Sequence, residues 1–264
     1  MSFDDLLYKE ARTLESEVSF DVKKEFTKNI EAYLHLYNLI IHLLFLIRQT
    51  AEEEININKL KLLPNLSDLN PNKKFIQNSI LKKINSKKEY TNIDNHKIQS
   101  IAKNIFKKIK KTKTYLEYMQ QGEKDKKIEA NLILRILKNH IIVNEKIHDF
   151  IEEHSIYWND DLLIVYNTLL EKINNKQNLN IIQLFRHKED EVYAYRLLEK
   201  TIENIDNTNQ VITQLAKNWD KDRIALSDLI IMKMAITEMK CFAKIPNKVT
   251  LDEYIDISKE YSSP

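Results

Sequence analysis

The chain of 264 residues contains a single glycine, Gly122, and only four prolines. Hairpin-rich β folds depend on glycine for turns with positive φ, and the common nucleotide-binding loops depend on closely spaced glycines. This composition therefore argues against both a turn-rich β architecture and a glycine-built phosphate loop. The dominance of Leu, Ile, Lys, Glu and Asn, with 43% hydrophobic residues, favours helices around a sizeable core. We predict an all-α fold.

Apolar residues recur at helical spacing along most of the sequence. The pattern predicts helical regions at Phe3–Glu54 (with a break at Ser19–Asp21), Lys74–Ile84, Lys97–Gln121, Asp125–Glu153, Asn159–Ile173, Glu189–Asn204, Asn207–Trp219 and Asp228–Met239, and from Thr250 onward. Pro64–Pro71 is rich in turn-forming residues and is expected to be a loop. Gly122 is expected to end a helix in the left-handed conformation. Thr250, followed three residues later by Glu253, fits a helix-starting capping box.

The sequence predicts a cytoplasmic protein. Cys241 is the only cysteine, which excludes an internal disulfide and an all-cysteine zinc site. The N-terminal residues lack the apolar centre of a secretory signal. The longest apolar run, Leu36–Ile47, is shorter than the roughly 20 residues that cross a bilayer. We therefore expect no membrane association.

Charge is unevenly distributed although the net charge is only +2. Residues 73–127 hold 16 Lys and Arg against 5 Asp and Glu, so a basic segment lies between acidic ends. The densest run, Phe106–Tyr115, contains five lysines and two aromatic residues. It could follow a nucleic-acid backbone, or it could be the solvated face of a helix in a lysine-rich protein. The sequence leaves both interpretations open.

No catalytic or metal-binding pattern is present. The histidine pairs His35/His42 and His140/His148 are seven and eight residues apart, rather than the three or four that place ligands on adjacent helical turns. No serine lies in a nucleophile-elbow context, and Cys241 has no histidine nearby in sequence. We predict that the protein is not an enzyme and that it uses no metal and no cofactor.

The last quarter of the chain has a distinctive order of parts. The helix Asp228–Met239 is apolar nearly all round, which is typical of the centre of a bundle. Trp219 and Asp222–Ile224 precede it, and Ile245–Pro246 with a Val-x-x-Asp-Glu pattern follows it. This order resembles the C-terminal half of the NusB family of bacterial transcription antitermination factors. The resemblance covers residues 189–261 best.

Weaker similarity extends upstream. The segments Asp68–Ile76 and Ser155–Leu162 resemble the longer, Bacteroidetes-type members of the family, which carry an additional helical region. The resemblance implies a NusB-like helical domain at residues 155–264, preceded by an N-terminal helical region at residues 1–154 that includes the basic segment.

The resemblance also implies a function in binding. Family members pair with a small-subunit ribosomal protein, the Nus E factor, and the pair holds boxA RNA and supports ribosomal RNA transcription, with indirect contact to the elongating RNA polymerase. The positions that match the family's partner-binding acids are Asp222 and Asp228. The positions that match its RNA-binding lysines or arginines are Lys233 and Lys248.

Each assignment has a simpler alternative. Asp228 could complement the dipole of its own helix instead of, or as well as, binding a partner. Lys233 and Lys248 could be ordinary surface lysines. Helical adaptor function without RNA binding is the alternative for the whole protein, and a detached NusB-like domain of an RNA-modifying enzyme is another.

The chain departs from the family pattern at both ends. Met1–Glu15 offers only Lys9 and Arg12 where the family has an Arg-rich first helix, and the sequence after Tyr261 lacks the family's closing helix. We expect a chain trimmed at both ends, with a correspondingly reduced RNA surface.

Overall fold

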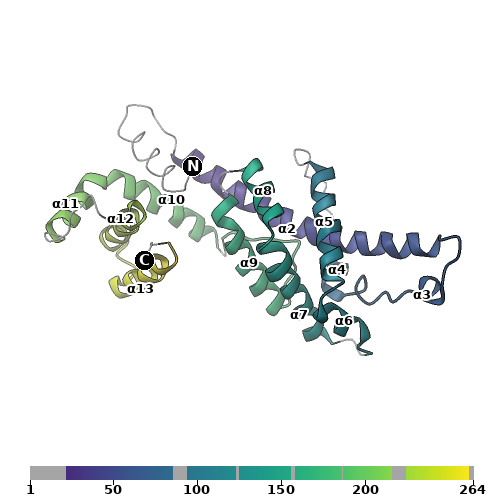
Figure 1. The fold of residues 1–264 in the computed structure, drawn as a ribbon. Helices are drawn as coiled ribbons and strands as arrows, with labels where there is room; N and C mark the ends of the chain where they lie inside the picture. Colours follow the sequence, from purple (N-terminus) through teal and green to yellow (C-terminus); the bar gives the residue numbers. More distant parts are fainter. Residues whose placement is uncertain are drawn as a thin grey trace. The chain divides into compact units, whose positions relative to one another are not determined.

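The computed structural model describes residues 22–85, 94–122, 125–155, 158–185, 187–215 and 224–261. Contacts divide the chain into two compact units, Lys24–Ile182 and a second unit that includes Gln183–Pro264. We call them the N-terminal and C-terminal units and describe each by itself. Every regular element in the described ranges is a helix, which confirms the predicted all-α fold (Figure 1).

The helices differ widely in length, and α2 is much the longest. In chain order, the N-terminal unit is formed by α2 (Val22–Lys59), α3 (Leu66–Leu69), α4 (Ser79–Lys83), α5 (Asn95–Ile109), α6 (Lys113–Gln120), α7 (Lys126–Ile136), the π-helix η1 (Leu137–Ile142), α8 (Glu145–His154) and α9 (Trp158–Asn174). The C-terminal unit contains α10 (Lys188–Glu203), α11 (Ile205–Leu215), α12 (Leu226–Cys241) and α13 (Asn247–Tyr261).

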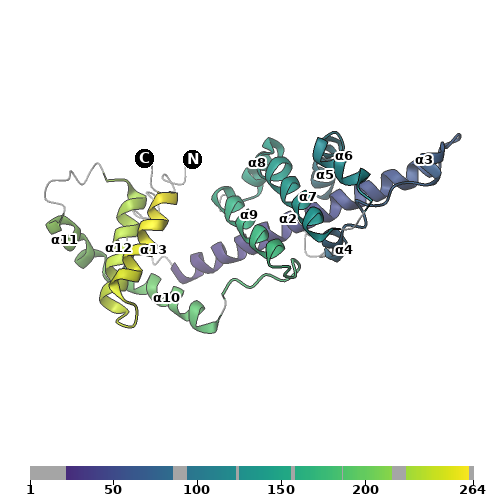
Figure 2. The same ribbon diagram turned by 90° about the horizontal axis from the view of Figure 1, so that it is seen from below.

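The long helix α2 supplies the largest share of the N-terminal core. Figure 2 shows the long course of this helix. Its middle is buried almost all round, at Leu36, Tyr37, Leu39, Ile40, Ile41, Leu43, Leu44, Leu46, Ile47 and Ala51. Polar contacts fix α9 and the loop after it against this helix. The Trp158 indole N–H donates to the Ala32 carbonyl at 2.8 Å, and the Tyr37 hydroxyl donates to the Leu179 carbonyl at 2.9 Å.

One helix in the described part of the chain, α2, is long and apolar enough to cross a bilayer, with a mean hydropathy of 1.6 over its most apolar 18 residues. Half of that window is buried within the protein, and the core helix of a water-soluble protein meets the same criteria. The length and composition of α2 are therefore weak evidence for a membrane span. The cytoplasmic location stays a prediction.

Two of the predicted helices are interrupted in the structure. The region Lys97–Gln121 divides into α5 and α6 because the Thr112 side chain accepts the Tyr115 backbone N–H and caps a new helix. The region predicted as one helix, Asp125–Glu153, passes through η1 and then restarts at Asn144, whose side chain caps α8. Local capping side chains therefore override the continuous apolar pattern in both places.

The left-handed conformation predicted for Gly122 is wrong. Helix α6 ends instead through the extended residue Gln121, whose N–H donates to the Glu117 carbonyl at 3.2 Å. Among the described residues the left-handed conformation occurs at Lys176, which has a φ of 56° and follows the end of α9.

In the C-terminal unit, α12 packs against α10, α11 and α13, which agrees with the central position predicted for its apolar sequence. The capping box predicted at Thr250 is wrong. Helix α13 begins three residues earlier, at Asn247, and the N–H groups of Val249 and Thr250 both donate to the Pro246 carbonyl. Thr250 is consequently buried inside the first turn.

Candidate functional site

The best-defined polar arrangement in the C-terminal unit surrounds Glu238, near the end of α12. Its side chain is only 6% exposed. The Tyr193 hydroxyl of α10 donates to Glu238 Oε2 at 2.8 Å, and the Thr250 hydroxyl of α13 donates to Oε1 at 2.9 Å. The side chain of Tyr254, on α13, lies near enough to this carboxylate for its pKa to be affected. A buried carboxylate needs such donors, so the network ties three helices to one another.

The same carboxylate changes the acidity of the tyrosines around it. Burial raises the pKa of Tyr254, and the nearby negative charge of Glu238 raises it further. Burial and the hydrogen bond to Glu238 raise the pKa of Tyr193 in the same way. Both hydroxyls therefore remain protonated donors over the whole physiological pH range.

Sequence analysis did not predict this network. Glu238 lies near the C-terminal end of the helix that the sequence predicts as apolar nearly all round. Its donors lie 45 residues upstream and 12 residues downstream, at Tyr193 and Thr250. A lone acidic residue within an otherwise apolar helix is a signal for such donors, because an unpaired charge would not be buried there.

Asp228, the first candidate for partner binding, lies in the first turn of α12 and is half-buried. Its Oδ1 atom is inaccessible to solvent and has no hydrogen-bond partner among the described residues. The carboxylate also lies where it complements the positive end of the helix dipole. Both interpretations of Asp228 therefore remain open, and an incoming cation would have to reach the carboxylate through Oδ2 or after a local movement.

The two candidate RNA-binding lysines lie on neighbouring helices. Lys233 is half-buried on α12, and Lys248 is exposed in the first turn of α13. The helices lie side by side in both views, and the Thr250–Glu238 contact places the start of α13 against the end of α12 (Figure 2). Because a helix rises about 1.5 Å per residue, Lys248 and Asp228 lie at opposite ends of this hairpin.

The remaining candidate, Asp222, lies outside the described residues, as do Trp219 and the part of the predicted region Phe3–Glu54 up to its break at Ser19–Asp21. Of the three candidate residues that the structure describes, Asp228 and Lys233 lie on α12 and Lys248 lies on α13.

In the basic run Phe106–Tyr115, the two aromatic side chains do not face solvent. Phe106 and Tyr115 are buried and pack against Phe75, with ring centroids 5.5 Å and 5.4 Å from it. They are therefore core residues and cannot offer their faces to bases. Of the lysines, Lys110 pairs with Glu54.

The other lysines of this run lie on the surface. Lys107 and Lys108 belong to the last turn of α5, where cations complement the helix dipole, and with Lys111 and Lys146 they border a hollow of about 250 Å³. The geometry fits both a solvated helix end and a weak anion contact. Within the described ranges no three His, Cys, Asp or Glu side chains gather closely enough to hold a metal ion.

Comparison with known proteins shows which family part of the chain resembles. Residues 158–264 match the model of the NusB family. The match begins at Trp158 and so includes α9, which packs in the N-terminal unit against α2. The division predicted between residues 154 and 155 stays a prediction. No solved structure matches the chain.

Curated relatives agree with the family match. The chain is 38% identical over 72 residues to the transcription antitermination protein NusB of Salinibacter ruber, a stretch that covers 27% of this chain and 45% of the relative. It is 36% identical over 74 residues to the NusB of Dictyoglomus turgidum, covering 28% and 51%. It is 32% identical over 98 residues to that of Thermodesulfovibrio yellowstonii, covering 37% and 64%. The chain thus spans about half the length of the curated relatives it matches.

Proposed function

We propose that this chain, whose residues 158–264 match the model of the NusB family, acts as a transcription antitermination factor. The observation that carries the proposal is the family match over α9 to α13, together with curated relatives that bear this name. The proposed role is binding rather than catalysis. A helical hairpin held by a buried carboxylate network provides a rigid surface for such a role.

The proposed protein partner is a small-subunit ribosomal protein that acts as Nus E. Asp222 and Asp228 are the proposed contacts, because carboxylates form charge-assisted hydrogen bonds with the basic side chains of ribosomal proteins. The unpaired Oδ1 atom of Asp228 supports this assignment, since a buried oxygen without a donor favours a structural change that supplies one.

The proposed nucleic-acid partner is boxA-containing RNA. Lys233 and Lys248 are the proposed phosphate contacts, and contact with the RNA polymerase elongation complex would be indirect. Lysines suit phosphate as compact point charges, and each contact with a single strand adds about 0.7 to the slope of log affinity against log salt.

A second candidate is a helical protein–protein adaptor that does not bind RNA. One observation favours it: the apolar side chains of Val249, Leu251 and Ile255 on α13 are each about half exposed. Exposed apolar residues on one helix are common at protein interfaces.

The test is calorimetric titration of the full chain with the ribosomal protein, with and without boxA RNA. Antitermination function predicts tight pairing that RNA strengthens. Pairing without any effect of RNA would support the adaptor. A folded chain that binds neither the ribosomal protein nor boxA RNA would contradict the proposal.

The RNA contacts are tested separately by filter binding at several salt concentrations. Lys233→Ala combined with Lys248→Ala should lower the salt slope by about 1.4, since two contacts with a single strand are lost. The matched control combines Lys188→Ala with Lys244→Ala, two exposed lysines of the same unit. An unchanged slope in the first pair would exclude Lys233 and Lys248 as RNA contacts.

A further inference from the structure

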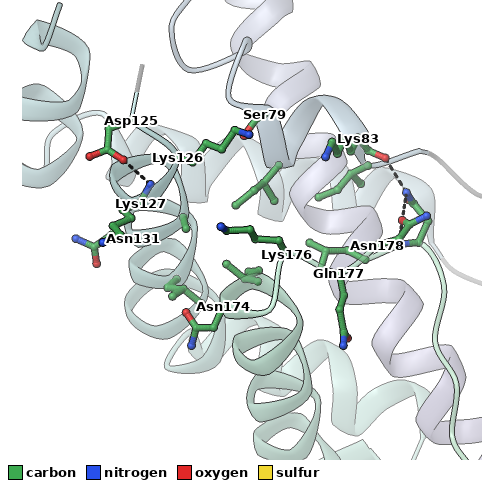
Figure 3. Close-up of a pocket in the computed structure, with 17 residues that line it drawn as sticks. Ser79, Lys83, Asp125, Lys126, Lys127, Asn131, Asn174, Lys176, Gln177 and Asn178 are labelled. Carbon is green, nitrogen blue, oxygen red and sulfur yellow. Dashed lines mark hydrogen bonds between the residues drawn. The ribbon is translucent and has the colours of Figure 1, made fainter. Parts of the chain in front are cut away.

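A large cavity lies within the N-terminal unit and has a volume of about 1010 Å³ (Figure 3). Three segments far apart in sequence line it: α4 with Ile84, Asp125 with α7 as far as Leu134, and the end of α9 with the loop that follows. Most of its lining lies outside residues 158–264, so the family match does not account for it.

The cavity carries a strong positive charge. Its lining includes four lysines, Lys83, Lys126, Lys127 and Lys176, and one acid, Asp125. The Asp125 side chain accepts the Lys127 backbone N–H at 2.7 Å and so caps α7. One carboxylate cannot balance four ammonium groups, and this one is already used by the backbone.

None of these four ammonium groups forms an ion pair within the described ranges, although other lysines of the same unit do. Lys61, Lys97 and Lys110 each pair with a carboxylate. The nearest buried acid of α7, Glu129, instead accepts hydrogen bonds from the backbone and side chain of Ser79. The cavity therefore keeps its positive potential, which low-dielectric walls concentrate.

The backbone holds one lysine in an uncommon conformation. Lys176 has a φ of 56°, a region usually occupied by glycine or asparagine at the end of a helix. The turn is closed by Lys176 N–H to the Ile173 carbonyl at 3.1 Å and by Gln177 N–H to the Lys172 carbonyl at 2.8 Å. Figure 3 shows the Lys176 side chain extending across the middle of the cavity, with Lys126 and Lys83 along its upper edge.

The remaining lining supplies two further kinds of surface. Ile80, Ile84 and Leu134 give apolar walls. The side-chain amides of Asn131, Asn174 and Gln177 form no hydrogen bond with any described residue, so both their donors and their acceptors are available to a ligand. The ammonium groups suit a phosphate, and the apolar walls suit the face of a planar base. The free amides suit the polar edge of that base.

We propose that this cavity binds a phosphate-bearing nucleotide, with Lys83, Lys126 and Lys176 around the phosphate and the amides at the base. Two kinds of ligand have this chemistry: a free mononucleotide, or one nucleotide unit of a single-stranded RNA. The site is separate from Asp228, Lys233 and Lys248, and it does not depend on the proposed antitermination function.

The test uses the full chain and fluorescence anisotropy with a labelled oligouridylate of about ten nucleotides, the upper range for one small binding site. Unlabelled uridine monophosphate and inorganic phosphate serve as competitors. Lys126→Glu combined with Lys176→Glu should weaken binding by about tenfold or more, because two phosphate contacts become repulsive. The matched control, Lys103→Glu with Lys138→Glu, makes the same charge change at exposed lysines of the same unit outside the cavity.

The unlabelled competitors distinguish a free mononucleotide from a strand of RNA as the ligand. Displacement by the mononucleotide identifies a free nucleotide as ligand, and displacement only by unlabelled oligouridylate identifies a strand. No binding of the labelled probe or of the mononucleotide would overturn the proposal. Equal losses of affinity in the cavity double variant and in the control double variant would also overturn the proposal, because such losses would reflect the change in net charge alone. Circular dichroism melting verifies that both double variants are folded.

Discussion

The Thr250 hydroxyl donates a hydrogen bond to Glu238 Oε1 at 2.9 Å and joins α13 to α12. Both residues are buried, and the second oxygen of the carboxylate is occupied by Tyr193. Helix α12 also packs on α10 and α11. The Glu238 carboxylate therefore holds together α12, which carries Asp228 and Lys233, and α13, which carries Lys248. The position of Lys248 relative to α12 therefore depends on a contact made two residues away, at Thr250.

Replacing Thr250 by valine should destabilise the C-terminal unit by about 1.5–3 kcal/mol, because a hydrogen bond to a buried charge is lost. The matched control is Thr237→Val. Thr237 is equally buried, but its hydroxyl has no hydrogen-bond partner among the described residues. Removing that hydroxyl should be neutral or stabilising. Urea denaturation followed by circular dichroism measures both, and equal losses in the two variants would contradict the role of the Thr250–Glu238 contact.

Reversing the charge at Asp228 should weaken binding of the ribosomal protein by about tenfold or more, since a charge-assisted contact becomes repulsive. Asp206→Lys is the control, because Asp206 also lies in the first turn of a helix of the same unit and is exposed. Both reversals should cost about 1 kcal/mol of stability through the helix dipole. Calorimetric titration would exclude Asp228 as a partner contact if the two variants lost affinity equally.

Alkaline pH should unfold the protein through its buried tyrosines. Burial raises the pKa of Tyr115 to about 12, and burial with the charge of Glu238 raises the pKa of Tyr254. A raised pKa means that the folded state keeps protons which the unfolded state loses above the ordinary value of 10.0. Stability is therefore complete below pH 10 and falls as pH rises, by about 1.4 kcal/mol per pH unit for each such tyrosine.

The measurement is the free energy of unfolding in urea between about pH 8 and about pH 11. Tyr254→Phe should make the fall above pH 10 shallower, because one of the titrating groups is removed. A fall of the same slope in the wild-type protein and in Tyr254→Phe would show that Tyr254 is not responsible.

The all-α class and most helix positions could be predicted because they depend on local pattern. The apolar helix predicted at Asp228–Met239 lies within α12, and the helix predicted at Asn159–Ile173 lies within α9. The errors occur where a single side chain overrides the pattern. Thr112 and Asn144 start new helices inside regions of continuous apolar spacing. Pro246, rather than Thr250, accepts the first N–H groups of α13.

The candidate sites were less accessible to sequence analysis because they are formed by distant residues. Glu238 is paired with side chains from two other helices. The lysines of the cavity, Lys83, Lys126 and Lys176, lie on three segments, and only the fold brings them together. Sequence analysis indicated the dense basic run at Phe106–Tyr115 as a possible nucleic-acid contact instead, although the aromatic residues of this run belong to the core.

Lys176 provides a last prediction that separates stability from binding. A lysine in the left-handed conformation costs about 1 kcal/mol relative to glycine, so Lys176→Gly should raise the free energy of unfolding by up to about that amount. Lys176→Ala keeps the strained backbone and should leave stability near that of the wild-type protein. Both variants remove the ammonium group, so both should weaken binding of the labelled oligouridylate by a similar factor.

Urea denaturation and fluorescence anisotropy on the same preparations give the two readouts. If the glycine variant is no more stable than the alanine variant, the backbone at Lys176 is not strained. If either variant binds the oligouridylate as tightly as the wild-type protein, the Lys176 side chain is not a ligand contact. A gain in stability that accompanies a loss of binding would show that the sequence retains lysine there for binding at the expense of the fold.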